Sequence, residues 1–94
     1  MTFRLPLPPR LARAWQVKIR DNERLEPPHV TILRGTRSWR LSPRTGRLLD
    51  RQPSGRLLPQ ELVEFVRMHL PLLVEHWDTM YPSNPVRSSD GEDE

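Results

Sequence analysis

Two periods of apolar residues divide the chain into a strand-forming part and a helix-forming part. Over residues 15–20, 29–33 and 37–41, apolar and polar side chains alternate, which is the period of a half-buried β-strand. Gly35-Thr36 supplies a tight reversal between the last two segments, as in a hairpin. Residues 47–50 follow a further turn as a short fourth strand or a strand-like return. The pattern therefore predicts an antiparallel meander of three to four strands.

After Pro59 the apolar residues recur at spacings of three and four, which is typical of an amphipathic helix. Pro59 suits the first position of a helix because that position needs no backbone donor. Pro71 interrupts the apolar stripe and disfavours helical backbone at the preceding residue, so we expect the helix to kink or split near Pro71. Tyr81-Pro82 ends it. The predicted fold class is α+β, with the sheet packed on one face by this C-terminal helix.

Both ends of the chain depart from these patterns. Proline-rich residues 1–11 predict an extended arm that joins no central strand. Residues 83–94 are polar and acidic, which predicts a disordered tail. A single domain is then expected over residues 12–82. A core this small has marginal stability, which favours a protein partner or self-association.

The residue inventory excludes several kinds of site. The chain has no cysteine, which removes disulfide frameworks, thiolate zinc sites and nucleophilic thiols. Motifs of nucleotide-binding proteins and serine hydrolases are missing, and the three histidines are not spaced to share a metal ion. We therefore expect no cofactor and no metal. The chain has no apolar run of spanning length and no signal-peptide core, so we expect a cytoplasmic protein without membrane association.

Charge is distributed unevenly along the chain. Residues 1–60 carry thirteen Lys/Arg and four Asp/Glu, a net +9, whereas residues 61–94 carry two and eight, a net −6. Fourteen of the fifteen cations are arginines, whose planar guanidinium suits phosphate and carboxylate groups. The acids at 90–94 are expected to compete with nucleic acid for the basic part of the chain.

Strand alternation places part of this positive charge on one face of the sheet. If the tryptophan and aliphatic positions of the strands point to the core, the alternate positions point outward together, and Thr31 is one of them. Such a face can hold phosphates and release counterions from nucleic acid, although an ordinary solvated face has the same composition. The predicted anion-binding or nucleic-acid-binding residues are Lys18, Arg20, His29, Arg40, Arg44 and Arg47.

Three segments resemble the hallmarks of a small bacterial family of unknown function. They are Pro27-Pro28-His29-Val30-Thr31-Ile32, Glu64-Phe65-Val66-Arg67-Met68-His69 and Glu75-His76-Trp77. The uncharacterised family, numbered four-one-six-zero, has a Pro-Pro-His-Phe-His-Val strand and a Leu-His…Asn-Trp C-terminal helix. Thr31 replaces the second strand histidine, and Phe65 stands where the family tends to have tryptophan. The resemblance implies a compact bacterial domain, often encoded beside another small domain as in toxin–antitoxin pairs.

Three functions compete on these observations. The favoured one is a non-enzymatic interaction or regulatory module of a toxin–antitoxin-like pair, which docks a protein partner and nucleic acid through the basic sheet face. The second is a small RNA-cleaving toxin with His29 as acid or base and arginines on the phosphate. Its candidate catalytic residues are His29, Arg37, Arg40 and Tyr81. The third is a structural subunit of a larger assembly.

Overall fold

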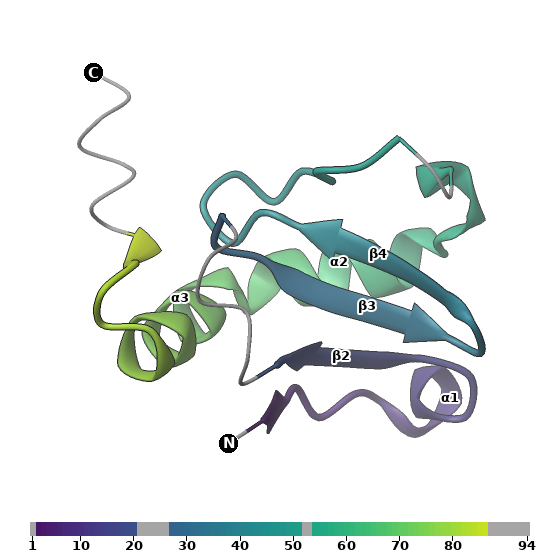
Figure 1. Cartoon of the computed structure of the whole chain (residues 1–94). Coiled ribbons are helices and arrows are strands. Elements are labelled where there is room, and N and C mark those ends of the chain that lie inside the picture. Colours follow the sequence, from purple (N-terminus) through teal and green to yellow (C-terminus); the bar gives the residue numbers. More distant parts are fainter. Residues whose placement is uncertain (1, 21–26, 52–53, 87–94) are drawn as a thin grey trace.

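The computed structural model describes residues 2–20, 27–51 and 54–86. Its sheet has four antiparallel strands in the order β1-β2-β3-β4, and two helices lie behind it (Figure 1). The predicted α+β meander is therefore confirmed. The elements in chain order are β1 (Phe3–Arg4), α1 (Pro9–Ala12), β2 (Gln16–Ile19), β3 (Val30–Arg34), β4 (Arg37–Leu41), the 3-10 helix η1 (Gly55–Leu57), α2 (Gln60–Met68) and α3 (Leu70–Met80).

The apolar side chains of alternate strand positions form the core, as their period predicts. Val17 pairs with Ile32, and Ile32 pairs with Trp39, so these three side chains make one row across the sheet. Each is at most 1% exposed. On the helical side, Leu62 and Val66 of α2 and Leu73 and Trp77 of α3 are fully buried. The core therefore lies between one face of the sheet and the apolar stripe of the two helices.

The N-terminal residues belong to the packed domain, so the prediction of a separate arm over 1–11 is wrong. β1 pairs with β2, and the Leu5 amide donates to the Val17 carbonyl at 2.8 Å. Leu5 and Leu11 are 4% and 5% exposed. Proline does not prevent this pairing because β1 itself contains none, and Pro9 takes the first position of α1, where a missing donor costs nothing.

The return after β4 forms only one β-bridge, between Leu41 and Leu48. Two further backbone hydrogen bonds of 2.8 Å hold it beside β4: Ser42 N–H to the Arg47 carbonyl, and Leu49 N–H to the Arg40 carbonyl. Residues 47–50 thus form the strand-like return that was one of the two predicted alternatives. The strand that completes the four-stranded sheet is instead β1, at the N-terminal end of the chain.

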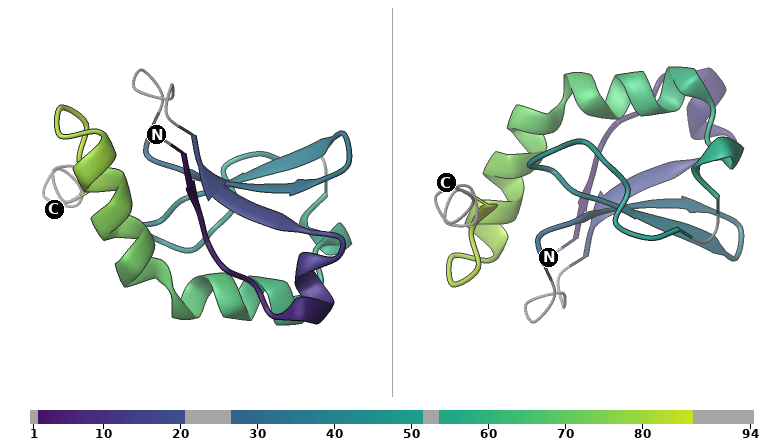
Figure 2. Two further views of the ribbon diagram at one scale, coloured as in Figure 1. Left: turned by 90° about the horizontal axis from the view of Figure 1, so that it is seen from below. Right: turned by 90° about the horizontal axis from the view of Figure 1, so that it is seen from above.

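The predicted break near Pro71 separates α2 from α3 at His69, whose ψ of 12° is outside the helical range. Pro71 stands in the first turn of α3, where no helical acceptor is left without its donor. Figure 2 shows the two helices meeting at an angle on one side of the sheet. Because the helix axis changes direction at this break, the buried residues of both α2 and α3 can pack against the twisted sheet.

Residues 81–86 fold back on α3, so the predicted tail does not begin at residue 83. The Trp77 indole donates to the Asn84 carbonyl at 2.7 Å, and the Val86 amide donates to Asp78 Oδ1 at 2.7 Å. Val86 is 1% exposed. These two bonds satisfy buried polar groups and close the end of the core. The remainder of the predicted tail, residues 87–94, lies outside the described residues.

Candidate anion-binding face

The sheet face opposite α2 and α3 is not covered by helix (Figure 1). We call it the open face; the outward strand positions and their immediate continuations that form it are Arg4, Gln16, Lys18, Arg20, Thr31, Leu33, Ser38 and Arg40. Strand register sets their order, because Arg4 pairs with Lys18, Lys18 with Thr31, and Thr31 with Arg40. Three cationic side chains therefore share one row across the sheet: Arg4 and Lys18 are one strand spacing of about 4.8 Å apart, and Arg40 lies two spacings from Lys18, beyond Thr31.

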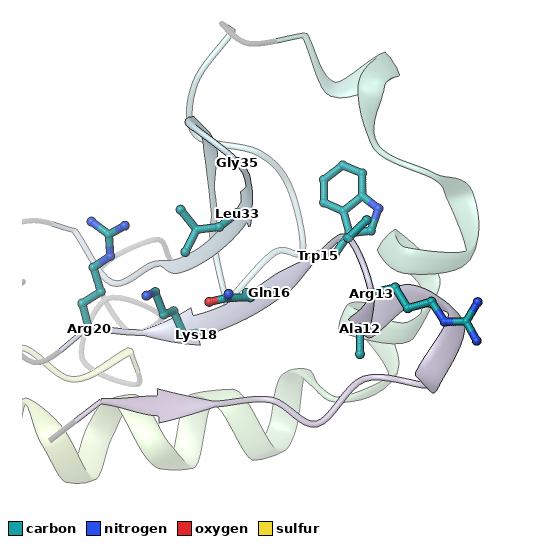
Figure 3. Close-up of a pocket in the computed structure, with 9 residues that line it drawn as sticks. Ala12, Arg13, Trp15, Gln16, Lys18, Arg20, Leu33 and Gly35 are labelled. Atoms are coloured by element: carbon teal, nitrogen blue, oxygen red, sulfur yellow. The ribbon is translucent and has the colours of Figure 1, made fainter.

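Lys18 and Arg20 project side by side from β2 and its end, and they line a surface hollow of about 320 Å³ (Figure 3). The hollow also contains Gln16, Leu33 and Arg13, and Arg13 follows α1. Side chains two apart on a strand are about 6.6 Å apart along one face. The hollow thus presents separate guanidinium and ammonium groups, each able to donate to a different anionic oxygen.

Thr31 was expected to be exposed on this face, but it is only 4% exposed. It lies in register between Lys18 and Arg40, both of which are half-buried. Long cationic side chains commonly lay their methylene stems over a sheet while their charged ends stay in water. Thr31 therefore separates the cations and contributes no ligand.

Arg40 is on the open face as predicted, but its guanidinium is occupied by Asp50. Arg40 Nε and Nη2 donate to the two carboxylate oxygens of Asp50 at 2.8 and 2.7 Å. The hydrogen bond from Arg40 is the main cause that lowers the pKa of Asp50 below 3.8. Because this fork already holds a carboxylate, Arg40 is a weaker anion ligand than Lys18 or Arg20.

Arg44 and Arg47 are on the turn after β4, and neither lines the Lys18 hollow. Gly46, with φ of 74°, carries this turn against the helices, and its carbonyl accepts from Arg67 Nε at 3.1 Å. A Cβ at Gly46 would lie 3.2 Å from Leu70 Cδ1, so the packing here is close. The turn therefore belongs to the α2–α3 junction, and the predicted set of six residues divides into two groups.

His29 is not on the open face, and its prediction as an exposed anion ligand is wrong. It is 2% exposed, and its ring lies 5.6 Å from that of Trp77 in α3. Its Nδ1 lies 2.8 Å from the Pro27 carbonyl. His29 precedes the first residue of β3, so strand alternation does not set its direction.

The four candidates for an RNA-cleaving site are not brought together. Arg37 is opposite Arg34 at one end of the β3–β4 hairpin, and His29 is at the other, about 16 Å away along a strand of this rise. Tyr81 is 5% exposed, and its hydroxyl donates to the Arg20 carbonyl. Both His29 and Tyr81 thus have structural hydrogen bonds inside the domain, and the geometry of general acid–base catalysis is not formed.

The other two histidines pack against aromatic rings. The His76 ring stacks on Phe3 with centroids 3.7 Å apart, and His69 lies 4.4 Å from the ring of Phe65. In the described part of the chain, no three metal-ligating side chains gather into one group. No described helix has the length and apolar character required to cross a membrane.

Acidic side chains are concentrated in the helical layer. Among the described residues, four of the five acids are on α2 and α3, and the fifth is Asp50. Glu61 pairs with Arg10, and Glu64 accepts from Gln60 at 3.0 Å. The described cations lie mostly on the sheet, its turns and α1. The molecule is therefore electrostatically two-sided, with the open face as the positive side.

Arg4 and Arg13 are residues of this face and its hollow that the sequence prediction missed. Arg4 was assigned to the extended proline-rich arm predicted over residues 1–11, and Arg13 follows that arm directly. The alternation of Phe3, Arg4 and Leu5 is the signal that could have found Arg4, since Phe3 and Leu5 are the residues that pack inward.

In comparisons with known proteins, the chain matches no family model, no curated protein and no solved structure. The resemblance to the four-one-six-zero family, with the bacterial toxin–antitoxin-like partner that it implies, therefore stays a prediction.

Proposed function

We propose that the protein is a non-enzymatic module that binds nucleic acid through phosphate contacts of the open face. The observation that carries the proposal is the strand register that brings Arg4 and Lys18 side by side, with Arg20 next on the same face. These cations neutralise phosphates and release the counterions condensed on nucleic acid, which is the main source of sequence-independent affinity. The acids of α2 and α3 face away from this surface and oppose the binding little.

The side chains of the open face favour backbone recognition over base recognition. Trp15 lines the hollow, but it is only 5% exposed and Arg34 lies over its ring, which leaves little ring surface for a base. Trp39 is buried, and Phe3 stacks on His76. Proteins that hold single strands use aromatic platforms on which bases stack. We therefore expect a duplex to bind at least as tightly as a single strand of equal length, with little sequence preference.

Removing the two hollow-lining cations of β2 tests the proposal. K18Q/R20Q keeps the side-chain stems and removes two charges, so a duplex should bind roughly tenfold more weakly at low salt, and the slope of log K against log salt should fall by about two. Fluorescence anisotropy with a labelled duplex over a salt series measures both quantities.

The matched control is R47Q/R56Q, which removes the same charge from exposed positions outside the hollow. The proposal predicts that this variant keeps most of the affinity and the salt slope. Equal weakening by both pairs would mean that net charge alone drives the binding, and an unchanged K18Q/R20Q would remove the open face from consideration.

A further inference from the structure

The end of the β3–β4 hairpin holds an arginine pair that the open-face proposal does not use. Arg34 and Arg37 are direct cross-strand partners on either side of the turn Gly35-Thr36. Both side chains are exposed, and neither has a carboxylate partner among the described residues. Like charges directly opposite one another destabilise a sheet. The pair therefore concentrates positive charge at the end of the hairpin, where the two guanidinium groups repel each other.

Trp15 fixes the position of Arg34. The guanidinium carbon of Arg34 lies 5.3 Å from the centre of the Trp15 ring, within the range of a cation–π contact. Trp15 itself packs against the buried Trp39 with ring centroids 5.6 Å apart. A cation–π contact uses no hydrogen-bond acceptor, so it leaves the N–H groups of the guanidinium for an anion. Arg34 is thus oriented before any ligand arrives.

The two arginines border a hollow of about 450 Å³ at this end of the sheet. Its polar lining residues are Arg34, Thr36 and Arg37, and its apolar lining residues are Trp15, Trp39 and Leu57. Leu57 is 47% exposed, which leaves an apolar surface beside the charges. This composition suits a compact anion attached to a flat organic group.

We propose that Arg34 and Arg37 form a clamp for a phosphate monoester, with the organic part of the ligand against the exposed Leu57 beside Trp15. A phosphate monoester carries a charge of about −1.5 to −2 at neutral pH, which two guanidinium groups neutralise. Arginine binds such groups through paired, charge-assisted hydrogen bonds. The monoester is either a free nucleotide or the phosphorylated end of a nucleic acid strand. The two hollows share Trp15 and Gly35, but Arg34 and Arg37 do not line the Lys18 hollow, so the clamp does not rest on the open-face proposal.

Titration with inorganic phosphate and with 5′-AMP tests the clamp. We expect both to shift the Trp15 indole N–H resonance in NMR spectra, and 5′-AMP to bind more tightly than inorganic phosphate because it also covers Leu57. R34Q/R37Q should weaken 5′-AMP binding about tenfold or more, whereas R47Q/R56Q should not. If both ligands leave Trp15 unchanged, or if R34Q/R37Q binds them as wild type does, the clamp is disproved.

Two further measurements test whether Arg37 has a structural role and whether the clamp is independent of the open face. R37Q relieves the repulsion within the pair, so its urea midpoint should be equal to or above that of wild type, and a lower midpoint would mean that Arg37 is structural and overturn the inference. K18Q/R20Q should retain the response of Trp15 to 5′-AMP while losing duplex affinity, so the two proposals fail separately.

The source of the phosphate is decided with one oligonucleotide carrying either a 5′-phosphate or a 5′-hydroxyl group. Tighter binding of the phosphorylated form, lost in R34Q/R37Q, assigns the clamp to strand ends. Equal binding of the two forms, together with 5′-AMP binding that depends on Arg34 and Arg37, assigns it to a free nucleotide.

Discussion

Lys18 and Arg40 occupy the same row of the open face, yet they differ in what they can bind. Lys18 lines the hollow, whereas Arg40 is forked onto Asp50. The difference comes from the return after β4, which hydrogen-bonds beside the strand and delivers a carboxylate to Arg40. At the scale of a residue, strand alternation therefore sets the face on which a side chain lies. Whether Arg40 can bind an anion depends on Asp50, ten positions further along the chain.

The Arg40–Asp50 pair predicts a pH dependence of stability. The pKa of Asp50 is lowered below 3.8, chiefly by the hydrogen bond from Arg40, so the folded state favours the charged carboxylate. This contribution is present above the ordinary pKa and is lost as pH falls through the lower folded value. Because the pair is about one-third exposed, D50N should cost only about 0.5–1 kcal/mol of unfolding free energy at neutral pH.

Urea unfolding of wild type and D50N at neutral pH and at acidic values below 3.8 measures this contribution. The two proteins should differ at neutral pH and converge in acid. E75Q is the control, since it removes a carboxylate from an exposed position on α3. A difference between wild type and D50N that persists unchanged into acid would contradict the assigned cause.

At the scale of the element, the short strand β1 contributes to the stability of the whole domain. It covers the edge of β2, and Phe3 of this strand stacks on His76 of α3. The chain then passes through α1, and Arg10 pairs there with Glu61 of α2. The N-terminal segment therefore connects the sheet to both helices, which makes it part of the cooperative unit.

Shortening Leu5 tests this role. Leu5 is 4% exposed, so L5A should lower the free energy of unfolding by about 2–3 kcal/mol through lost burial and an unfilled cavity. Chemical denaturation of wild type and L5A provides the comparison. L49A is the matched control, because Leu49 is 42% exposed and its truncation should change stability by less than about 0.5 kcal/mol. Equal stability of L5A and wild type would contradict the packing of Leu5 in the core and favour the extended arm of the sequence prediction.

At the scale of the whole molecule, folding converts a charge gradient along the chain into two faces. The cation-rich segments form the sheet and its turns, and the described acids other than Asp50 lie in the helical layer. The four acids at 90–94 follow the helical layer in the chain. Their charge opposes an anionic ligand wherever they approach the open face, and this effect is screened by salt over about 8 Å under physiological conditions.

Deleting residues 88–94 should therefore tighten duplex binding severalfold at low salt and have little effect at high salt. The deletion begins at 88 because Val86 is part of the core and Arg87 is a cation. Anisotropy titrations at two salt concentrations measure the change. The variant D90N/E92Q/D93N/E94Q keeps the length and removes the same charge, so it should behave like the deletion. Tightening by the deletion alone would assign the effect to bulk instead of charge.

Much of the fold follows from local pattern, and much less of the candidate site does. Lys18 and Arg20 were found by alternation, because both flank buried core positions of β2 or its end. His29 was misplaced because it precedes β3, where the strand period no longer holds. Its ring packs instead beside Trp77 of α3. Arg4 was missed because the prolines that follow it predicted an extended arm, and the two-residue strand β1 was too short to be recognised from its alternation. Each error concerns a contact between segments far apart in the sequence.

The sequence by itself determined the strand periods, the hairpin turn, the helix break near Pro71 and the charge asymmetry, because steric and solvation preferences of neighbouring residues specify these properties. Only the tertiary structure decided which cations stay available. Tyr81 reaches the Arg20 carbonyl across 61 positions, and Val86 closes the core against Asp78. Such contacts depend on how all the layers pack, and the period of one segment carries no information about its distant partner.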